Sequence, residues 1–240
     1  MTARSKFWLI TLSALLAIAV TLALGRWQLS RAAQKQAVQA SIDEKTGSPP
    51  LSGPALASLP DPAQEMYRGV SLRGRWLAER TVFLDNRPMN GKPGLYVVTP
   101  MKLEGGEAVI LVQRGWAARN FVDRTSVPTL DTPAGVVEIQ GRIVPPLSKL
   151  YELGGTETGL IRQNLDIAQF RAETGLPLLA VWVQQTGAAS EGLLREWPLA
   201  RTGVDKNYGY AFQWFGLSGL IVILYVWFQI VRRFIYPKRA

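Results

Sequence analysis

The residue types that carry most catalytic and metal chemistry are missing from this chain. The 240-residue sequence contains neither Cys nor His, and these two residues supply most transition-metal ligands and most catalytic thiols and imidazoles. Zinc fingers, thiolate-bound copper, His-based triads and CxxC redox chemistry are therefore excluded, and no disulfide can form. Carboxylates, hydroxyls, amines and guanidinium groups remain available for chemistry.

Two short motifs contain polar groups of the kinds that an active site uses. Ser148-Lys149 has the residue types of a Ser–Lys nucleophile, but neighbouring residues on an extended chain point to opposite sides. The segment Asn90-Gly91-Lys92-Pro93-Gly94 superficially resembles a phosphate-binding loop, but Pro93 and the strand pattern after it deny the helix N-terminus that such a loop needs. We interpret it as a hairpin turn. A membrane-anchored periplasmic hydrolase stays an alternative that requires a convergent Ser–Lys or paired-carboxylate site.

Three arginines lie beside or within predicted strands, next to Pro or Gly: Arg87, Arg114 and Arg142. A guanidinium suits a carboxylate because its planar fork donates two parallel hydrogen bonds. Each arginine is therefore a candidate for binding an acidic group of a cofactor or of a partner protein. The alternative for each one singly is a solvated or ion-paired arginine at the surface.

The charge of the chain is unevenly distributed. The formal net charge is +9, from 27 Lys plus Arg and 18 Asp plus Glu. All the acidic residues lie between Asp43 and Asp205, and the basic residues of that stretch almost balance them. The remaining bases lie towards the two ends without acidic partners, which predicts membrane topology rather than nucleic-acid binding.

Two long uncharged apolar runs lie near these basic ends, at 7–25 and at 207–231. About 20 helical residues cross a hydrocarbon layer of about 30 Å, and a helix satisfies its own backbone polar groups there. The second run has aromatic residues at both of its ends, which is typical of interfacial belts. We predict two transmembrane helices. A cleaved signal peptide is less favoured for the first run because its only small-x-small site, Ala17-Ile18-Ala19, lies inside the run.

The short flanks of the second span predict the orientation. Arg232, Arg233, Lys238 and Arg239 follow that span, against Lys206 just before it, and Lys and Arg favour the cytoplasmic side. The N-terminus (1–6) and the basic tail (232–240) are therefore expected in the cytoplasm. The near-neutral middle is expected outside, in a bacterial periplasm or a mitochondrial intermembrane space.

Between the spans, residues 26–65 are expected to form a stalk and a linker. The stretch from Arg26 to Lys45 contains no Gly or Pro and predicts a helix that ends near Gly47. Five prolines between Ser48 and Pro62 predict an extended linker.

Residues 66–205 are expected to form a β-rich domain. Apolar and polar residues alternate in short runs separated by turn residues, which predicts strands near 70–76, 81–84, 95–100, 108–112, 136–143 and 178–183. Asn90-Gly91 and Gly105-Gly106 favour hairpin turns. One helix is predicted over Ile167 to Thr174, capped by Asp166 and ended by Gly175. The fold class is two transmembrane helices flanking a predominantly antiparallel β (α+β) domain, a small sheet or barrel with a short helix.

Polar side chains are rare within the second span, and Gln213 lies near its outer end. An uncompensated amide in lipid costs about 1–2 kcal/mol or more, so Gln213 is expected to contact something. Gly216 allows another helix to approach closely. Packing against the first span is one explanation. The other is docking of a partner's transmembrane helix or of a hydrophobic cofactor beside Tyr210 and Trp214.

Five segments, in order and spacing, resemble the Surfeit-locus-one family of cytochrome c oxidase biogenesis proteins. The match covers nearly the whole chain. The segments are Gly25-Arg26-Trp27-Gln28-Leu29-Ser30-Arg31 with Lys35, Tyr67-Arg68-Gly69-Val70 with Gly74, Gly94-Leu95-Tyr96-Val97-Val98-Thr99-Pro100, Ile110-Leu111-Val112-Gln113-Arg114-Gly115-Trp116, and Tyr210-Ala211-Phe212-Gln213-Trp214-Phe215-Gly216-Leu217.

The resemblance implies a bacterial inner-membrane protein that assists assembly of a haem–copper oxidase around the stage when haem a enters subunit I. It implies a chaperone rather than an enzyme, with oxidase subunit I and other assembly factors as partners. A structural subunit of a respiratory complex is the alternative. Partner-binding residues would be Trp27, Gln28, Gln213 and Gly216, and haem a would be contacted by Tyr210, Trp214 and Arg114.

One position departs from the family pattern. Many relatives carry a His three residues before the tyrosine that corresponds to Tyr210, and that His is associated with haem a. This chain has Asn207 there. Asn is a poor iron ligand, and because the sequence contains no His, the chain offers no imidazole to a haem iron.

Overall fold

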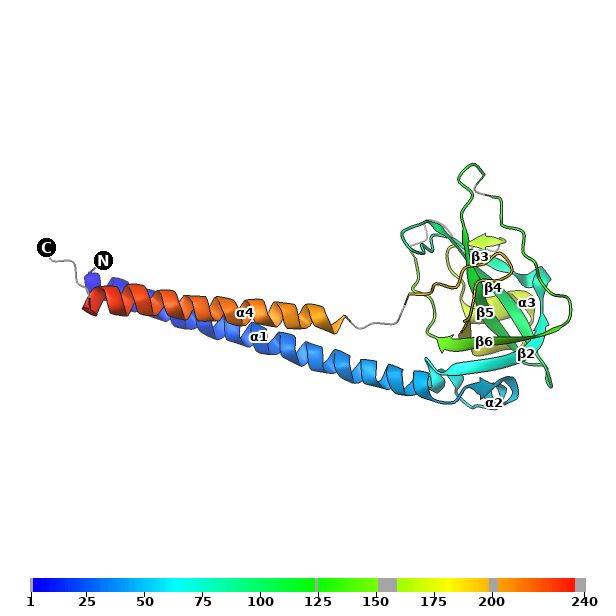
Figure 1. The fold of residues 1–240 in the computed structure, drawn as a ribbon, viewed down its shortest axis with the longest axis horizontal. Coiled ribbons are helices and arrows are strands. Elements are labelled where there is room, and N and C mark those ends of the chain that lie inside the picture. The colour runs from blue at the N-terminus through cyan, green and yellow to red at the C-terminus, as the bar shows by residue number, and fades with distance from the viewer. Residues whose placement is uncertain (1, 124, 151–158, 199–202, 236–240) are drawn as a thin grey trace. The chain divides into compact units, whose positions relative to one another are not determined.

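The computed structural model describes residues 2–123, 125–150, 159–198 and 203–235 of the chain (Figure 1). The chain forms two compact units, one made of residues 1–41 and 200–240 and the other of residues 42–199. The first unit is a pair of helices and the second is a β-rich domain with a short helix. These elements confirm the predicted fold class.

The helix pair consists of α1 (Ala3–Gly47) and α4 (Val204–Tyr225), which η3 (Val226–Ile235) continues as a π-helix. Both helices contain segments long and apolar enough to cross a membrane. α1 ends at Gly47, as the sequence predicted. The basic tail expected at 232–240 lies outside the described residues from position 236 onward.

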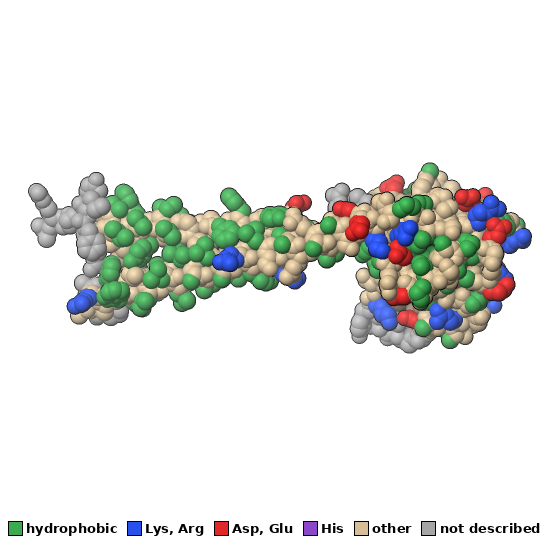
Figure 2. All heavy atoms as spheres, turned by 90° about the horizontal axis from the view of Figure 1, so that it is seen from below, with side chains coloured by type: hydrophobic (Ala, Val, Ile, Leu, Met, Phe, Trp, Pro, Cys, Tyr) green, Lys and Arg blue, Asp and Glu red, His purple; other side chains and the backbone are tan. Residues whose placement is uncertain are grey.

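The surface of the helix pair is apolar. Hydrophobic side chains gather along it, whereas acidic and basic side chains gather on the β-rich domain (Figure 2). Leu16 is 66% exposed and Phe212 is 79% exposed. Apolar patches of this extent are not left in water, because soluble monomers expose contiguous patches of only a few hundred Å². These side chains therefore face lipid or a partner.

The β-rich domain is built on a five-stranded barrel. The strand order is β2-β6-β8-β5-β4, and a β2–β4 pairing closes the ring. The pairs are antiparallel except β5–β8, which is parallel. Three short strands lie outside the ring: β1 pairs with β2, β3 with β4 and β7 with β3. The strands are β1 (Leu51–Ser52), β2 (Gly69–Trp76), β3 (Val82–Leu84), β4 (Gly94–Leu103), β5 (Val109–Ala118), β6 (Val136–Val144), β7 (Ile161–Arg162) and β8 (Leu178–Gln185).

Alternation along the strands divides the core into two main clusters. The interior cluster draws on all five barrel strands and includes Leu72, Met101 and Val183. The outer cluster includes Trp182 of β8 and Phe170 of the short helix α3 (Ile167–Thr174). The short helix therefore covers part of the outer face of the barrel.

The predicted turns and the predicted helix caps are confirmed. Asn90 and Gly91 have φ values of 50° and 74°, and Met89 pairs with Lys92 across them, which is the geometry of a two-residue hairpin. Asp166 accepts hydrogen bonds from the backbone of Ala168 and Gln169 at the start of α3, and Gly175 ends the helix at φ 70°.

The proline-rich segment differs from the extended linker that the sequence predicted. It forms strand β1, the short helix α2 (Gly53–Ala57) and the 3-10 turn η1 (Pro62–Glu65). Leu56 is fully buried in the interior cluster. Glu65 bonds to both Lys45 and Arg68 at 3.1 Å, and these hydrogen bonds lower its pKa. Proline fits here because it occupies first helical turns, where its missing N–H is not needed.

Candidate partner-binding site

One face of α1 is less exposed than the rest along most of its length. Its residues follow each other at alternating spacings of three and four, the repeat that keeps a seam facing a partner helix. Many of them are small or polar, as is usual where membrane helices approach closely. The residues of this seam are Phe7, Thr11, Ala14, Ile18, Thr21, Gly25, Gln28, Ala32, Lys35 and Gln39.

The seam of α1 packs against α4, and the two helices run antiparallel (Figure 1). A Cβ at Gly25 would lie 2.6 Å from Cε1 of Phe215, so the seam needs glycine at this point. Nearer the chain termini, Thr11 Oγ1 lies 2.9 Å from the hydroxyl of Tyr225. Ala211 and Ser218 of α4 are buried on the same side.

Three polar side chains join the helices where α4 begins. Lys35 Nζ donates to Asn207 Oδ1 at 2.8 Å, and Asn207 Nδ2 donates to Gln28 Oε1 at 2.7 Å. Asn207 therefore holds the pair together, with both ends of its amide in use. Sequence reasoning missed this contact, although Gln28 and Lys35 stand one heptad apart and so share a face of α1.

The opposite side of α4 has no cover from α1. Gln213 stands about 200° around the helix from buried Ala211, and it is exposed. In the part of the chain that the structure describes, nothing lies within 4 Å of a Cβ built at Gly216. The explanation that Gln213 packs against the first span is therefore wrong within this chain. We call this surface the open face, and its residues are Gly209, Phe212, Gln213, Gly216, Leu220 and Ile223.

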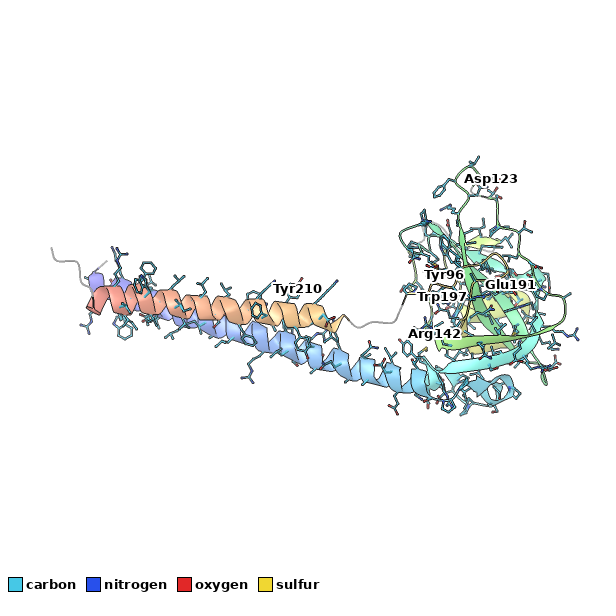
Figure 3. The ribbon with its side chains drawn as sticks, in the orientation of Figure 1. Tyr96, Asp123, Arg142, Glu191, Trp197 and Tyr210 are labelled. Carbon is cyan, nitrogen blue, oxygen red and sulfur yellow. The ribbon has the colours of Figure 1, made fainter. Side chains whose placement is uncertain are left out.

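The other residues proposed on the helices lie beside these two surfaces. Tyr210 is 52% exposed on α4 (Figure 3), and Trp214 is half-buried. Trp27 is 55% exposed on α1, whereas its neighbour Gln28 faces the seam. Gln213 and Gly216 are thus together on one face, and Gln28 serves contacts within the pair.

Arg114 lies in the β-rich domain and is fully buried. Its guanidinium stacks over Trp76, with Cζ 4.7 Å from the ring centroid. It donates to Glu191 Oε2 and to Thr132 Oγ1, each at 2.8 Å. Because this charge is enclosed and paired, the structure argues against the predicted role in holding a propionate.

A second buried arginine shares the carboxylate of Glu191. Arg195 Nη2 lies 3.6 Å from Glu191 Oε2, and its Nε donates to the carbonyl of Arg114 at 2.8 Å. Burial lowers the pKa of Arg195, and the negative charge of Glu191 opposes that shift. Glu191 has φ 58°, a conformation that favours Gly or Asn. Gly192 marks a turn at this point, but nothing in the local sequence shows that Glu191 pairs with two arginines.

The other two candidate arginines are also largely shielded. Arg142 donates from Nε and Nη2 to Gln184 Oε1, at 3.0 and 2.7 Å, on the outer side of the barrel (Figure 3). Arg87 is only 7% exposed. Burial lowers the pKa of both. The alternative of a solvated or ion-paired arginine at the surface is wrong about the position of Arg87 and Arg114, which are buried, but Arg114 is ion-paired, with Glu191.

The described residues give little support to an active site at either of the two short motifs, Ser148-Lys149 and the segment 90–94. Ser148 and Lys149 are both exposed, and Asn90-Gly91 is a hairpin turn. Within the described ranges no group of three or more carboxylates could hold a metal ion.

Comparison with known proteins identifies the family. Residues 15–219 match the model of the SURF1 family. This chain belongs to the SURF1 family. The chain is 28% identical over 221 residues to a SURF1-like protein of Rickettsia bellii, covering 89% of this chain and 88% of that protein. It is also 28% identical over 245 residues to a SURF1-like protein of Drosophila melanogaster, covering 91% and 77% of the two chains.

One further relative has a more specific description. The cytochrome oxidase assembly protein SHY1 of Saccharomyces cerevisiae is 30% identical over 100 residues, covering 41% of this chain and 25% of the yeast protein. These matches confirm the family that the sequence motifs predicted.

The residues of this SURF1 family member do not fit axial ligation of a haem iron. The position of the expected His is Asn207, whose amide oxygen already accepts from Lys35 at 2.8 Å. Arg114, expected to hold a propionate, is enclosed by Trp76 and Glu191. We therefore assign no haem-dependent step to these residues.

Proposed function

We propose that this protein is an assembly factor for a haem–copper cytochrome c oxidase. In this proposal it acts as a chaperone, not as an enzyme, by docking the open face of α4 against a transmembrane helix of oxidase subunit I. The docking holds subunit I around the stage at which haem a is inserted. Membership of the SURF1 family supports the oxidase as the target, as does the name of the yeast relative.

The observation that carries this proposal is the exposure of Gln213 on the open face. An amide facing hydrocarbon lacks hydrogen-bond partners, and interhelical hydrogen bonds of such groups contribute about 1–2 kcal/mol at most. Gly216 lies one turn further along the same face, with open space beside it. A partner helix can therefore approach the backbone at Gly216 while it bonds to Gln213. α1 is already committed to the other side of α4.

We further propose that the protein resides in a bacterial inner membrane with both termini in the cytoplasm and the β-rich domain in the periplasm. The antiparallel packing of α1 and α4 supports this topology, because two antiparallel spans return the chain to the side from which it started. Reporter fusions within residues 67–200 test it. Reporters active in the cytoplasm would contradict the proposal.

Deletion of the gene tests the function. Membranes of the deletion strain should have a lower haem a to haem b ratio and lower oxidase activity. Gly216→Leu should fail to restore both, because leucine blocks close approach, whereas Gly216→Ala should restore them. Unchanged spectra and activity in the deletion strain would refute the proposal. Stoichiometric copurification with the mature oxidase would instead indicate a structural subunit.

Site-specific cross-linking tests the docking surface separately. A photoreactive phenylalanine analogue at Phe212 lies on the open face, and the same analogue at Phe215 lies in the seam beside Gly25. The analogue at position 212 should capture oxidase subunit I, and the analogue at position 215 should not. Equal capture from both positions, or capture from neither, would contradict docking through the open face.

A further inference from the structure

A cavity of about 690 Å³ lies on the outer side of the barrel in the β-rich domain. Its walls are β8, the start of α3, and the chain segments 146–150 and 164–166. This volume is within the range of small-molecule sites, about 300–1,000 Å³. All the residues that line the cavity belong to the β-rich domain, and the proposed function does not use it.

The floor of the cavity is apolar. Trp182 of β8 is 1% exposed and belongs to the outer cluster. Leu147, Leu165 and Ile167 line the cavity and pack against the same cluster while staying partly exposed. A ligand with an apolar body would therefore remove these side chains from water without disturbing the core.

A buried cation forms part of the wall. Arg87 donates from Nη1 to the carbonyl of Ser148 at 3.2 Å and from Nη2 to that of Gln163 at 2.9 Å, while its Nε has no partner within the described ranges. Among the described residues no carboxylate pairs with it. A guanidinium has five N–H donors and is always charged, so two neutral carbonyls leave both charge and donors uncompensated.

The backbone of Arg87 is fixed in place. Its N–H donates to the carbonyl of Gly94 at 3.0 Å, and its own carbonyl accepts from Trp116 Nε1 at 2.7 Å. The charge is thus held beside the cavity instead of extending to solvent. Burial also lowers the pKa of Arg87, which reflects the cost of a charge without a counter-ion.

The rim of the cavity adds positive charge. Lys149 and Arg171 both line it and are exposed. Of the lining residues that the structure describes, only Asp166 is acidic, and its Oδ1 caps α3 by accepting from Ala168 N at 2.9 Å. The cavity therefore combines an apolar floor with cationic walls.

We propose that this cavity binds a small amphipathic carboxylate, with its carboxylate on the guanidinium of Arg87 and its apolar body over Trp182. A carboxylate supplies the counter-ion that the described residues lack, and it can accept the second N–H of Nη1 or Nη2, each of which donates to one carbonyl. Such charge-assisted bonds are the strong ones. The site is independent of the docking surface on α4.

Binding can be measured with 4-(4-fluorophenyl)butyrate, a water-soluble carboxylate with an apolar body, by the broadening of its ¹⁹F NMR signal. The full-length protein is placed in phosphatidylcholine nanodiscs, and empty nanodiscs give the blank. The amide of the same acid is the matched ligand without charge. The carboxylate should bind about tenfold or more tightly than the amide, because it alone pairs with Arg87.

Three variants distinguish the cavity from other sites. Ala180→Phe fills the cavity from β8, where Ala180 is exposed and lines it, and Arg87→Gln removes the charge. Each should weaken carboxylate binding about tenfold or more. Arg73→Gln, at an arginine whose side chain is 61% exposed, should leave binding unchanged. If Arg87→Gln unfolds the domain, the Ala180→Phe variant alone tests whether the carboxylate binds in this cavity. Equal binding of acid and amide, no binding at millimolar ligand, or unchanged binding to a folded Ala180→Phe variant would overturn the proposal.

Discussion

Replacing Glu191 with Ala should strongly destabilise the β-rich domain. Glu191 is the carboxylate that two enclosed arginines share: Arg114, whose side chain has no exposed surface, and Arg195, whose side chain is 3% exposed. Removing one partner of a buried ion pair leaves an uncompensated charge and costs about 3–5 kcal/mol. A domain of this size changes its melting temperature by about 2–4 °C per kcal/mol. The expected loss is therefore about 6–20 °C.

The measurement is thermal unfolding of the full-length protein in detergent, followed by near-ultraviolet circular dichroism. Glu104→Ala is the matched control, because it breaks the Arg73–Glu104 pair, in which the two side chains are 61% and 50% exposed. Exposed pairs of this kind contribute about 0–1 kcal/mol. If Glu191→Ala lowers the melting temperature no more than Glu104→Ala does, the buried charge is not what holds this region together.

A second substitution separates charge from backbone strain at the same position. Glu191 has φ 58°, where a side chain costs about 1 kcal/mol relative to glycine. Glu191→Gly removes the same carboxylate but relieves this strain. It should be more stable than Glu191→Ala by about 1 kcal/mol and still far less stable than the wild type. Full recovery in the glycine variant would mean that strain, not the buried ion pair, dominates.

Three further outcomes are expected. Gly74→Ala places a Cβ against the carbonyl of Lys102 on the paired strand and should lower the free energy of unfolding by about 1–3 kcal/mol, as measured by thermal unfolding. Gly135→Ala is the control, because a Cβ there meets no described atom, and it should lower the stability little. Equal losses of stability in the two variants would contradict this role of Gly74. A disulfide engineered between positions 28 and 207 of this Cys-free chain reports whether α1 and α4 stay packed. Gly25→Leu should prevent this disulfide from forming, whereas Gly219→Leu should not, because a Cβ at Gly25 meets Phe215 and one at Gly219 meets nothing within the described ranges. If the disulfide forms in both variants, the seam tolerates a large side chain. The pKa of Glu173 is lowered from its ordinary value of 4.5, chiefly by the hydrogen bond from Arg162. The ionised carboxylate therefore stabilises the fold above about pH 4.5, and this stabilisation is lost as the pH falls through the lower folded pKa. On acidification the melting temperature of Glu173→Gln should fall less than that of the wild type, and equal falls in the two proteins would refute this role of Glu173.

Local patterns predicted the local structure well. The strands near 70–76 and 136–143, the turn at Asn90-Gly91 and the cap at Asp166 all depend on neighbouring residues. These features follow from alternation and from turn chemistry, which act over a few positions. The family resemblance also followed from short segments in order.

Pairing between distant segments was not predictable in the same way. Alternation shows that β5 and β8 are strands but does not show that they pair in parallel, or that β2 and β4 close the ring. Leu56 within the proline-rich segment carried no signal that it fills the barrel interior. Tertiary packing decides such positions.

The candidate site residues show the same limit. Residue type marked Arg114 as a binding group, yet its burial against Trp76 is a property of the closed barrel. Helical periodicity, in contrast, places Gln213 and Gly216 on one face. Only the position of α1 shows that this face is left open.

The closed barrel constrains how the β-rich domain can meet another protein. In the described part of the chain, the outermost strands of the sheet are β1 and β7, which are two residues each. Strands this short give a foreign strand too little backbone for β-augmentation or edge-to-edge aggregation. Any recognition by this domain would therefore depend on side chains and loops, which surface substitutions can change while the hydrogen-bonded ladder stays intact.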